Sequence, residues 1–179
     1  KLGLRRETYE RITRANYLYQ NLYQLYQTEG SALYASDEDL AVYAADQGYI
    51  TADHILLATK DTATGEALSD EQKAEKKALA EELAEKLRSY TGDDLASYFA
   101  ELADEYSEDP GRASYPSGYT FTTGSMVQEF EDAAYALSEG EVSDIVESSF
   151  GYHILLRLPL DKATAAETVR EDYFSSLID

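Results

Sequence analysis

The tetrapeptide His-Ile-Leu-Leu occurs twice in this chain, about a hundred residues apart, and its two copies hold the only histidines, His54 and His153. The second copy, in residues 152–156, is too apolar for a strand with one solvated face, so we expect two neighbouring central strands. Side chains of a strand alternate between its faces, which places each histidine on one face with the leucine two residues on. The repeat therefore predicts two imidazoles that meet on one face of a sheet.

The second copy closes a run with recognisable start and stop signals. Ser125 and Gln128 have the spacing of a capping box, which predicts a helix that begins directly after Ser125. Its apolar positions return at helical spacing: Met126, Val127, Phe130, Ala133, Ala134 and Leu137. Gly140 is expected to stop this helix, and residues 142–147 to form a strand that a turn at 149–151 joins to the last strand.

The rest of the chain predicts further helices around one more strand. We expect a strand over 49–58 and a polar linker over 59–68, with Gly65 as a turn. Helices are expected over 7–27, over 37–47 capped by Ser36 and stopped by Gly48, from Ser69 and Gln72 with Leu79, Leu83 and Leu87 as a stripe, from a cap at Asp93 to Tyr106, and over 164–178. Helices that cover a small sheet make an α+β arrangement.

Charge and composition exclude several function classes. The formal charge of -20 makes nucleic acid and anionic membranes poor partners, because both are bound by neutralising phosphate. Residues 1–30 hold five Lys or Arg against three Glu, so the remainder carries -22. That acidic body favours basic or neutral unfolded clients, or it is a solvated surface without a role in recognition. The absence of cysteine excludes disulfides, thiolate catalysis and cysteine-bound zinc.

Five segments together resemble one known family. The strand ADHILLAT, the helix end LADEYSEDPG, the run MVQEFEDAAYAL, the GEVSD turn and the closing FGYHILL are similar, in order and spacing, to a parvulin-type (PpiC) peptidyl-prolyl cis/trans isomerase. The likeness covers roughly residues 49–159 and is greatest to extracytoplasmic foldases of the PrsA kind. It implies a small, mostly antiparallel four-stranded sheet covered by helices, in a protein that accelerates isomerisation of X-Pro bonds in unfolded or exported polypeptides.

The resemblance also implies a domain organisation. Residues 1–48 would form a helical arm from a chaperone-type region, residues 49–159 the isomerase domain, and residues 160–179 a helix that packs with the arm. The arm is rich in tyrosine, which suits rings that are buried while their hydroxyls stay solvated. It either packs on other parts of a larger helical domain or grips extended polypeptide. Pairing of two such arms into a homodimer is a further option.

Site residues follow from the resemblance position by position. Met126 and Phe130 match the residues that hold the proline ring, although this spacing by itself is typical of core packing. Asp109 matches a position where some parvulins carry cysteine and others aspartate. His54 and His153 match the two family histidines beneath the site, and we interpret them as a hydrogen-bond network that fixes the carboxylate without proton transfer or nucleophilic attack, or else as purely structural.

One loop departs from the family pattern. Many parvulins have Gly-Gly-Asp-Leu-Gly where this chain has residues 116–121, so either Tyr119 or Phe121 closes the proline pocket. Phe150, in the turn before the last strand, is expected to bind substrate as well. Phosphate-specific parvulins carry a basic cluster after the first strand, whereas here Asp61, Thr62, Ala63, Thr64, Gly65 and Glu66 follow Lys60. We therefore expect no requirement for a phosphorylated residue before proline.

Other chemistries fit the residues poorly. Two histidines without HxH or HExxH spacing, in a chain without cysteine, do not make a zinc site, so we expect no metal and no cofactor. No serine has the glycine-flanked setting of a hydrolase nucleophile. The remaining alternative is a non-catalytic chaperone that holds extended polypeptide. The chain begins with Lys1, which we interpret as a processed or trimmed N-terminus; the resemblance implies an extracytoplasmic location, with any signal or membrane anchor outside this sequence.

Overall fold

The computed structural model describes residues 5–61 and 64–178 of the chain. Lys1 at the chain start, and Thr62 and Ala63 of the expected polar linker, lie outside the described residues. The chain divides into two compact units: residues 45–161 form one, and residues 1–44 with 162–179 form the other. The first unit is therefore inserted between two segments of the second. None of the described helices combines the length and the apolar character needed to cross a bilayer.

The inserted unit is built on a four-stranded antiparallel sheet, which confirms the expected α+β class. Its strands are β1 (Ile50–Ala58), β2 (Tyr119–Phe121), β3 (Val146–Glu147) and β4 (Gly151–Leu158), in the order β2-β1-β4-β3. The two histidine strands are the central neighbours, and every residue of β1 is buried. The continuous apolar runs of both strands are what burial on two faces requires.

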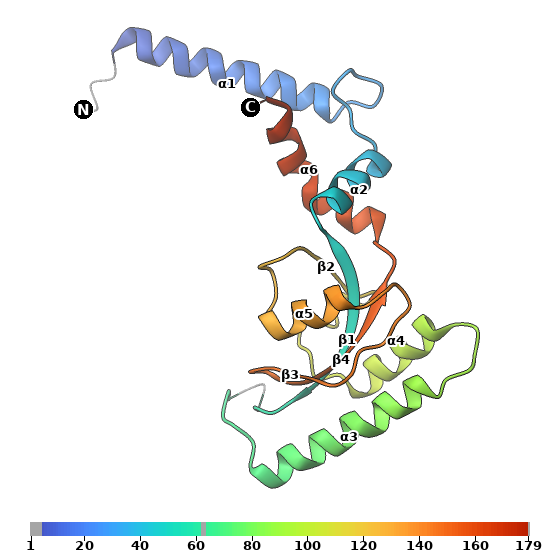
Figure 1. The fold of residues 1–179 in the computed structure, drawn as a ribbon. Coiled ribbons are helices and arrows are strands. Elements are labelled where there is room, and N and C mark those ends of the chain that lie inside the picture. Colours follow the sequence, from blue (N-terminus) through green and yellow to red (C-terminus); the bar gives the residue numbers. More distant parts are fainter. Residues whose placement is uncertain (1–4, 62–63, 179) are drawn as a thin grey trace. The chain divides into compact units, whose positions relative to one another are not determined.

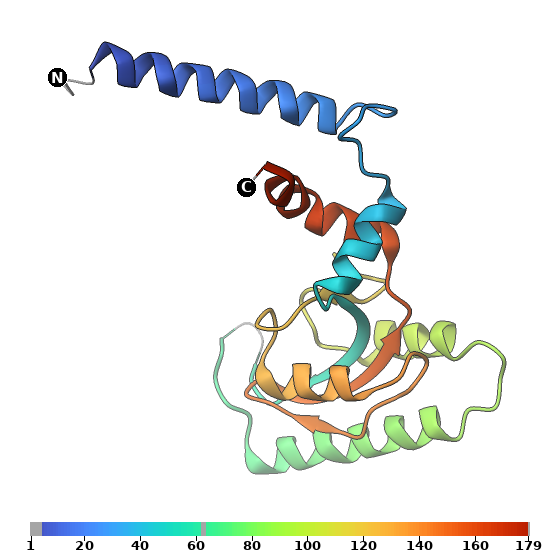
Figure 2. The ribbon, with the colours of Figure 1, turned by 45° about the horizontal axis from the view of Figure 1, so that its top comes forward.

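Helices cover the two faces of this sheet (Figures 1 and 2). Helices α3 (Asp70–Arg88) and α4 (Leu95–Tyr106) pack on the face formed by the odd positions of β1 and the even positions of β4. Helix α5 (Gln128–Ala136) packs on the opposite face, with its Phe130 and Ala134 buried. This second face also carries both histidines, so α5 is the helix that shapes their surroundings.

The predicted N-cap residue is confirmed for α3, whereas the one predicted for α4 precedes the actual N-cap by one residue. Ser69 and Gln72 form the predicted reciprocal capping box, and Leu83 and Leu87 of the predicted stripe are buried. The cap of α4 is Asp94 and not Asp93, because the Asp94 carboxylate accepts the backbone N–H of Ser97 at 2.9 Å. Both acidic residues are compatible with a cap, and only the backbone geometry distinguishes them.

The predicted capping box at Ser125 and Gln128 is wrong. Helix α5 begins at Gln128, with Val127 as its N-cap residue and without a side-chain cap. The carboxylate of Glu131, on the first turn, folds back instead and accepts the N–H groups of Gly124 at 3.0 Å and Met126 at 2.8 Å. The donors before the helix are thus satisfied from within it, which leaves Ser125 without that role.

The strand predicted over residues 142–147 is mostly absent, since β3 holds only Val146 and Glu147. Val142 makes an isolated bridge to Leu156, and the N–H of Leu155 donates to the side-chain oxygen of buried Ser143 at 2.9 Å. A side-chain hydroxyl therefore takes the place of a backbone carbonyl opposite β4. This side-chain hydrogen bond interrupts the backbone hydrogen-bond ladder but keeps the chain alongside β4.

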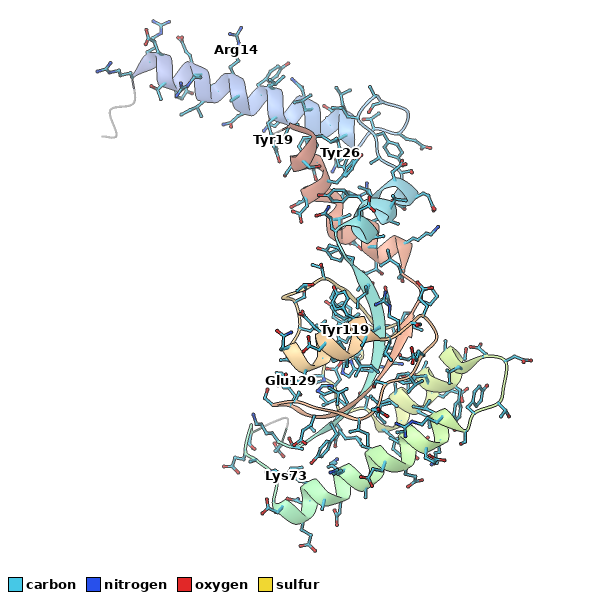
Figure 3. All side chains as sticks on the ribbon, in the orientation of Figure 1. Arg14, Tyr19, Tyr26, Lys73, Tyr119 and Glu129 are labelled. Atoms are coloured by element: carbon cyan, nitrogen blue, oxygen red, sulfur yellow. The ribbon has the colours of Figure 1, made fainter. Side chains whose placement is uncertain are left out.

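The other unit contains α1 (Arg6–Tyr26), most of α2 (Asp37–Asp46) and α6 (Lys162–Ile178). Tyr26 is fully buried, and its hydroxyl donates to the carbonyl oxygen of Arg170 at 2.9 Å. The ring of Phe174 lies 5.1 Å from that of Tyr26 and 5.4 Å from that of Tyr19, both labelled in Figure 3. The C-terminal end of α1 therefore packs on α6, whereas Tyr9 and Tyr17, nearer to its N-terminus, are exposed.

Candidate active site

A pocket of about 750 Å³ opens on the α5 face of the sheet. Four large side chains supply its apolar wall: Tyr119, Met126, Phe130 and Phe150. His54, Asp109 and His153 supply its polar base, and Lys60, Asp61, Gly65, Pro110 and Ser125 are among the other lining residues. All but one of the site residues predicted from the sequence thus line a single cavity.

The exception is Phe121, which the sequence left as an alternative to Tyr119. Phe121 is 2% exposed and packs in the core, with its ring 5.6 Å from that of Phe130. Both residues point to the same face of β2, but Tyr119 pairs with Ala52 and Phe121 with Ile50, further from His54. The register of β2 therefore brings Tyr119 to the pocket and places Phe121 beneath α5.

The register of the central strands brings the histidines together. His54 pairs with Leu155, and His153 pairs with Leu56, so the two imidazoles are diagonal neighbours with centroids 5.4 Å apart. The ring of Phe130 meets both edge to face, at 5.2 Å from His54 and 5.7 Å from His153. The residue expected to hold a proline ring therefore also covers the two imidazoles.

A carboxylate and a phenol complete the polar base. The Tyr119 hydroxyl donates to Oδ2 of Asp109 at 2.6 Å, and Nε2 of His54 lies 3.8 Å from the same oxygen. Burial, followed by this hydrogen bond, raises the pKa of Tyr119, so the phenol is a donor at neutral pH. The ring of Tyr119 stacks on His54 with centroids 5.6 Å apart.

Both histidines are neutral at neutral pH. Burial lowers the pKa of His153 to about 4, helped by the neighbouring His54, while Asp109 opposes the shift. Burial also lowers the pKa of His54, again against the opposing charge of Asp109. Ser148 lies 2.7 Å from Nε2 of His153, whereas Nδ1 of each histidine has no hydrogen-bond partner in the described part of the chain. A neutral imidazole can donate a hydrogen bond through its one N–H, but it lacks the acidic proton of an imidazolium and so does not act as a general acid near neutral pH.

The loop that holds Asp109 is fixed along the open edge of β1. The N–H of Leu56 donates to the hydroxyl oxygen of Ser107 at 3.1 Å, and the N–H of Glu108 donates to the carbonyl oxygen of Leu56 at 2.8 Å. The Glu108 carboxylate accepts the N–H of Ala58 at 2.8 Å. The two residues before Asp109 thus satisfy β1 where β2 no longer pairs with it.

Three other residues of this region gave no clear signal in the sequence. Arg112, which is half-buried, forms an ion pair with buried Asp53, its Nη1 lying 2.7 and 2.8 Å from the two carboxylate oxygens on the far face of the sheet. Glu131, which is 4% exposed, fixes the backbone of Met126, and its pKa is lowered by the N–H groups of Gly124 and Met126 that it accepts. Charged residues in a strongly acidic chain look like surface residues, and only the fold shows that Asp53 and Glu131 are buried.

A metal ion needs several ligands that converge on one point. Among residues 5–61 and 64–178, no three His, Asp or Glu side chains converge as a set of ligands. His54 lies beside Asp109, whose Oδ2 accepts the Tyr119 hydroxyl and whose Oδ1 accepts the Gly111 N–H.

Comparison with known proteins gives one consistent result. Residues 54–158 match the family model of the rotamase or PPIC-type PPIase domain. Foldase protein PrsA 4 of Bacillus cereus is 52% identical over 77 residues, which cover 42% of this chain and 25% of the relative. Foldase protein PrsA 1 of the same species is 38% identical over 128 residues, which cover 68% of this chain and 44% of the relative.

A solved structure agrees with these matches. The crystal structure of PrsA from Bacillus subtilis superimposes with a TM-score of 0.50 at 26% identity, covering 97% of this chain and 63% of that one. The chain spans less than half the length of the two Bacillus cereus relatives. The family model covers more than half of the chain and includes both histidines, and the chain therefore belongs to the PpiC-type peptidyl-prolyl cis/trans isomerase family.

Proposed function

We propose that this chain catalyses cis/trans isomerisation of X-Pro bonds in unfolded polypeptides, and that residues 49–159 form the isomerase domain. The single observation that carries the proposal is an apolar pocket, walled by Tyr119, Met126 and Phe130, whose base holds Asp109 beside two neutral histidines. A proline ring is small and apolar, and the amide next to it is polar, so the pocket offers a matching surface to each part.

The reaction requires little of the enzyme beyond a pocket that matches the substrate. Rotation about an X-Pro bond faces a barrier of ~18–20 kcal/mol and breaks no covalent bond. In the transition state the amide is twisted and its conjugation is lost. A site that binds this twisted form better than either planar isomer lowers the barrier. Neither a nucleophile nor a proton donor is required.

Each part of the pocket has a role in that account. Met126 and Phe130 hold the proline ring, while Phe150, which is 54% exposed and lies in the turn between β3 and β4, covers the ring. The Asp109 carboxylate orients the peptide and disfavours the planar amide by facing its carbonyl oxygen. His54 and His153 remain neutral, pack beneath Phe130 and keep the carboxylate in place.

We infer the substrates and the location from the matched relatives. The matched relatives are named foldases, so unfolded polypeptides are the substrates we assign to this chain. We place it outside the cytoplasm or at the cell envelope. The unit formed by α1, α2 and α6 would belong to a chaperone-type region, and pairing of such helical arms would give a homodimer.

The test is a protease-coupled assay on proline tetrapeptides. Wild-type protein should accelerate isomerisation well above buffer. Asp109→Ala should lower kcat/KM about tenfold or more, and Met126→Ala should act mainly through KM, because it removes part of the ring-binding wall. Turnover indistinguishable from buffer in the wild-type protein would reject the enzymatic proposal.

A second candidate function has one observation in its favour. Helix α1 exposes Tyr9, Ile12, Tyr17 and Leu18 to solvent, which suits a surface that holds extended polypeptide. The two functions are separable with Asp109→Ala and Met126→Ala. Suppression of client aggregation that survives both substitutions would place the holding activity in the helical arm.

A further inference from the structure

The loop-side wall of the pocket ends in a hydroxyl that faces a carboxylate. Tyr119 donates to Oδ2 of Asp109 at 2.6 Å, and this is the oxygen nearest to Nε2 of His54. The Tyr119 ring packs against His54, with centroids 5.6 Å apart, and against Tyr115, with centroids 4.6 Å apart. These contacts restrict rotation of the ring, and its hydroxyl is directed at the Asp109 carboxylate.

Gly111 provides the space that this hydroxyl occupies. A Cβ atom at Gly111 would overlap the Tyr119 hydroxyl oxygen, whereas the ring carbon that bears the hydroxyl would lie 3.2 Å away and Oδ2 of Asp109 3.4 Å away. Gly111 is not among the glycines with positive φ, so its backbone conformation is open to alanine. Glycine is therefore required at this position for the space that a side chain would fill, and not for its conformational freedom.

Gly111 also contributes a donor of its own. Its N–H donates to Oδ1 of Asp109 at 3.1 Å. The carboxylate is thus bound on both oxygens, by a backbone amide on one and by a phenol on the other. A carboxylate fixed on both oxygens needs little reorganisation when the substrate amide twists.

We propose that Tyr119 is a positioning residue for X-Pro isomerisation, whose hydroxyl fixes the Asp109 carboxylate toward the pocket. Position 111 is glycine because a side chain there would keep the Tyr119 hydroxyl from reaching the carboxylate. The inference rests on the proposed function and deepens it. It makes Gly111, in the loop after α4, and Tyr119, the first residue of β2, dependent on each other.

The test is a double-mutant cycle of Tyr119→Phe and Gly111→Ala in the full chain, with kcat and KM measured separately on a proline tetrapeptide. Tyr119→Phe keeps the ring wall and should lower kcat about tenfold with little change in KM, the factor expected for one lost hydrogen bond to a charged group. Gly111→Ala should lower kcat similarly by displacing the hydroxyl. The kcat of the double variant should be no lower than that of Tyr119→Phe alone. Without the hydroxyl, the alanine Cβ at position 111 meets only the ring carbon, at 3.2 Å, and a small shift relieves that contact.

Tyr115→Phe is the matched control, since it removes a hydroxyl from the half-exposed neighbouring ring and should leave both constants unchanged. Wild-type kcat in Tyr119→Phe, or losses that multiply in the double variant, would overturn this inference while leaving the isomerase proposal standing. A wild-type protein without turnover would instead overturn the isomerase proposal. Where Gly111→Ala fails to fold, recovery of folding in the double variant supports the pairing, and failure of both contradicts it.

Discussion

His153 couples the site to the stability of the fold. Burial lowers its pKa from 6.5 to about 4 in the folded chain, so between these values the unfolded chain binds more protons than the folded one. Stability therefore rises with pH across this window and is lost as the pH falls through it. From pH 7.5 to pH 5, this one group should cost about 2 kcal/mol of unfolding free energy. Urea unfolding at several pH values measures the loss.

His153→Gln supplies the comparison, because glutamine does not titrate. The loss of stability between pH 7.5 and pH 5 should be smaller in this variant than in the wild-type protein. The difference between the two curves is the informative quantity, since burial raises the pKa of Asp53 and that carboxyl acts in the opposite direction. Parallel curves would mean that His153 is solvated enough to titrate normally.

Single residues also show where sequence reasoning stops. The alternation of β1 and β4 was enough to predict that each histidine shares a face with the leucine two residues on, because alternation within a strand depends on parity alone. That both histidines lie on the same face of the sheet follows from the register that pairs His54 with Leu155. Tyr119 and Phe121 have the same parity, and only the pairing of β2 with β1 separates them. Pairing of residues far apart in sequence is a tertiary fact that no local pattern contains.

At the scale of elements, the ends of helices and strands were the least predictable feature. The long apolar runs of β1 and β4 and the capping box of α3 depend on nearby residues, and the structure has them as expected. The start of α5 depends on Glu131 reaching back to residues 124 and 126, and the length of β3 depends on Ser143 reaching across to β4. In both cases a polar side chain takes the place of a backbone hydrogen-bond partner, and hydrophobic periodicity contains no information about such contacts.

The reach of Glu131 gives a prediction for α5. Glu131→Gln keeps the size of the side chain but places a donor where one of two backbone N–H groups needs an acceptor. The backbone before α5 should then shift Met126, lowering kcat/KM roughly fivefold and reducing the urea midpoint, as loss of about one hydrogen bond implies. Glu129→Gln makes the same change at the exposed neighbour labelled in Figure 3 and should alter neither quantity. Equal behaviour of the two variants would contradict the role given to Glu131.

At the scale of the whole molecule, charge is the property most open to test. The inserted unit, residues 45–161, holds eight Lys or Arg against 25 Asp or Glu. Such an excess creates a negative potential around the pocket, which attracts cationic segments and repels anionic ones. Pairing with neighbouring cations offsets only part of it, and the pairs Lys86–Glu82 and Arg88–Asp144 lie at the surface, where water screens them.

Client selection by this potential should appear as a dependence on salt. Of two proline tetrapeptides that differ only in Lys or Glu before proline, the Lys peptide should have a kcat/KM about fivefold higher at low ionic strength. The ratio should approach one in about 0.5 M salt, where the Debye length is only a few ångströms. A neutral Ala peptide should fall between the two and change little. A ratio that does not respond to salt would mean that direct contacts with a residue at the pocket rim, such as Asp61, decide the preference and that the acidic surface only keeps the molecule in solution.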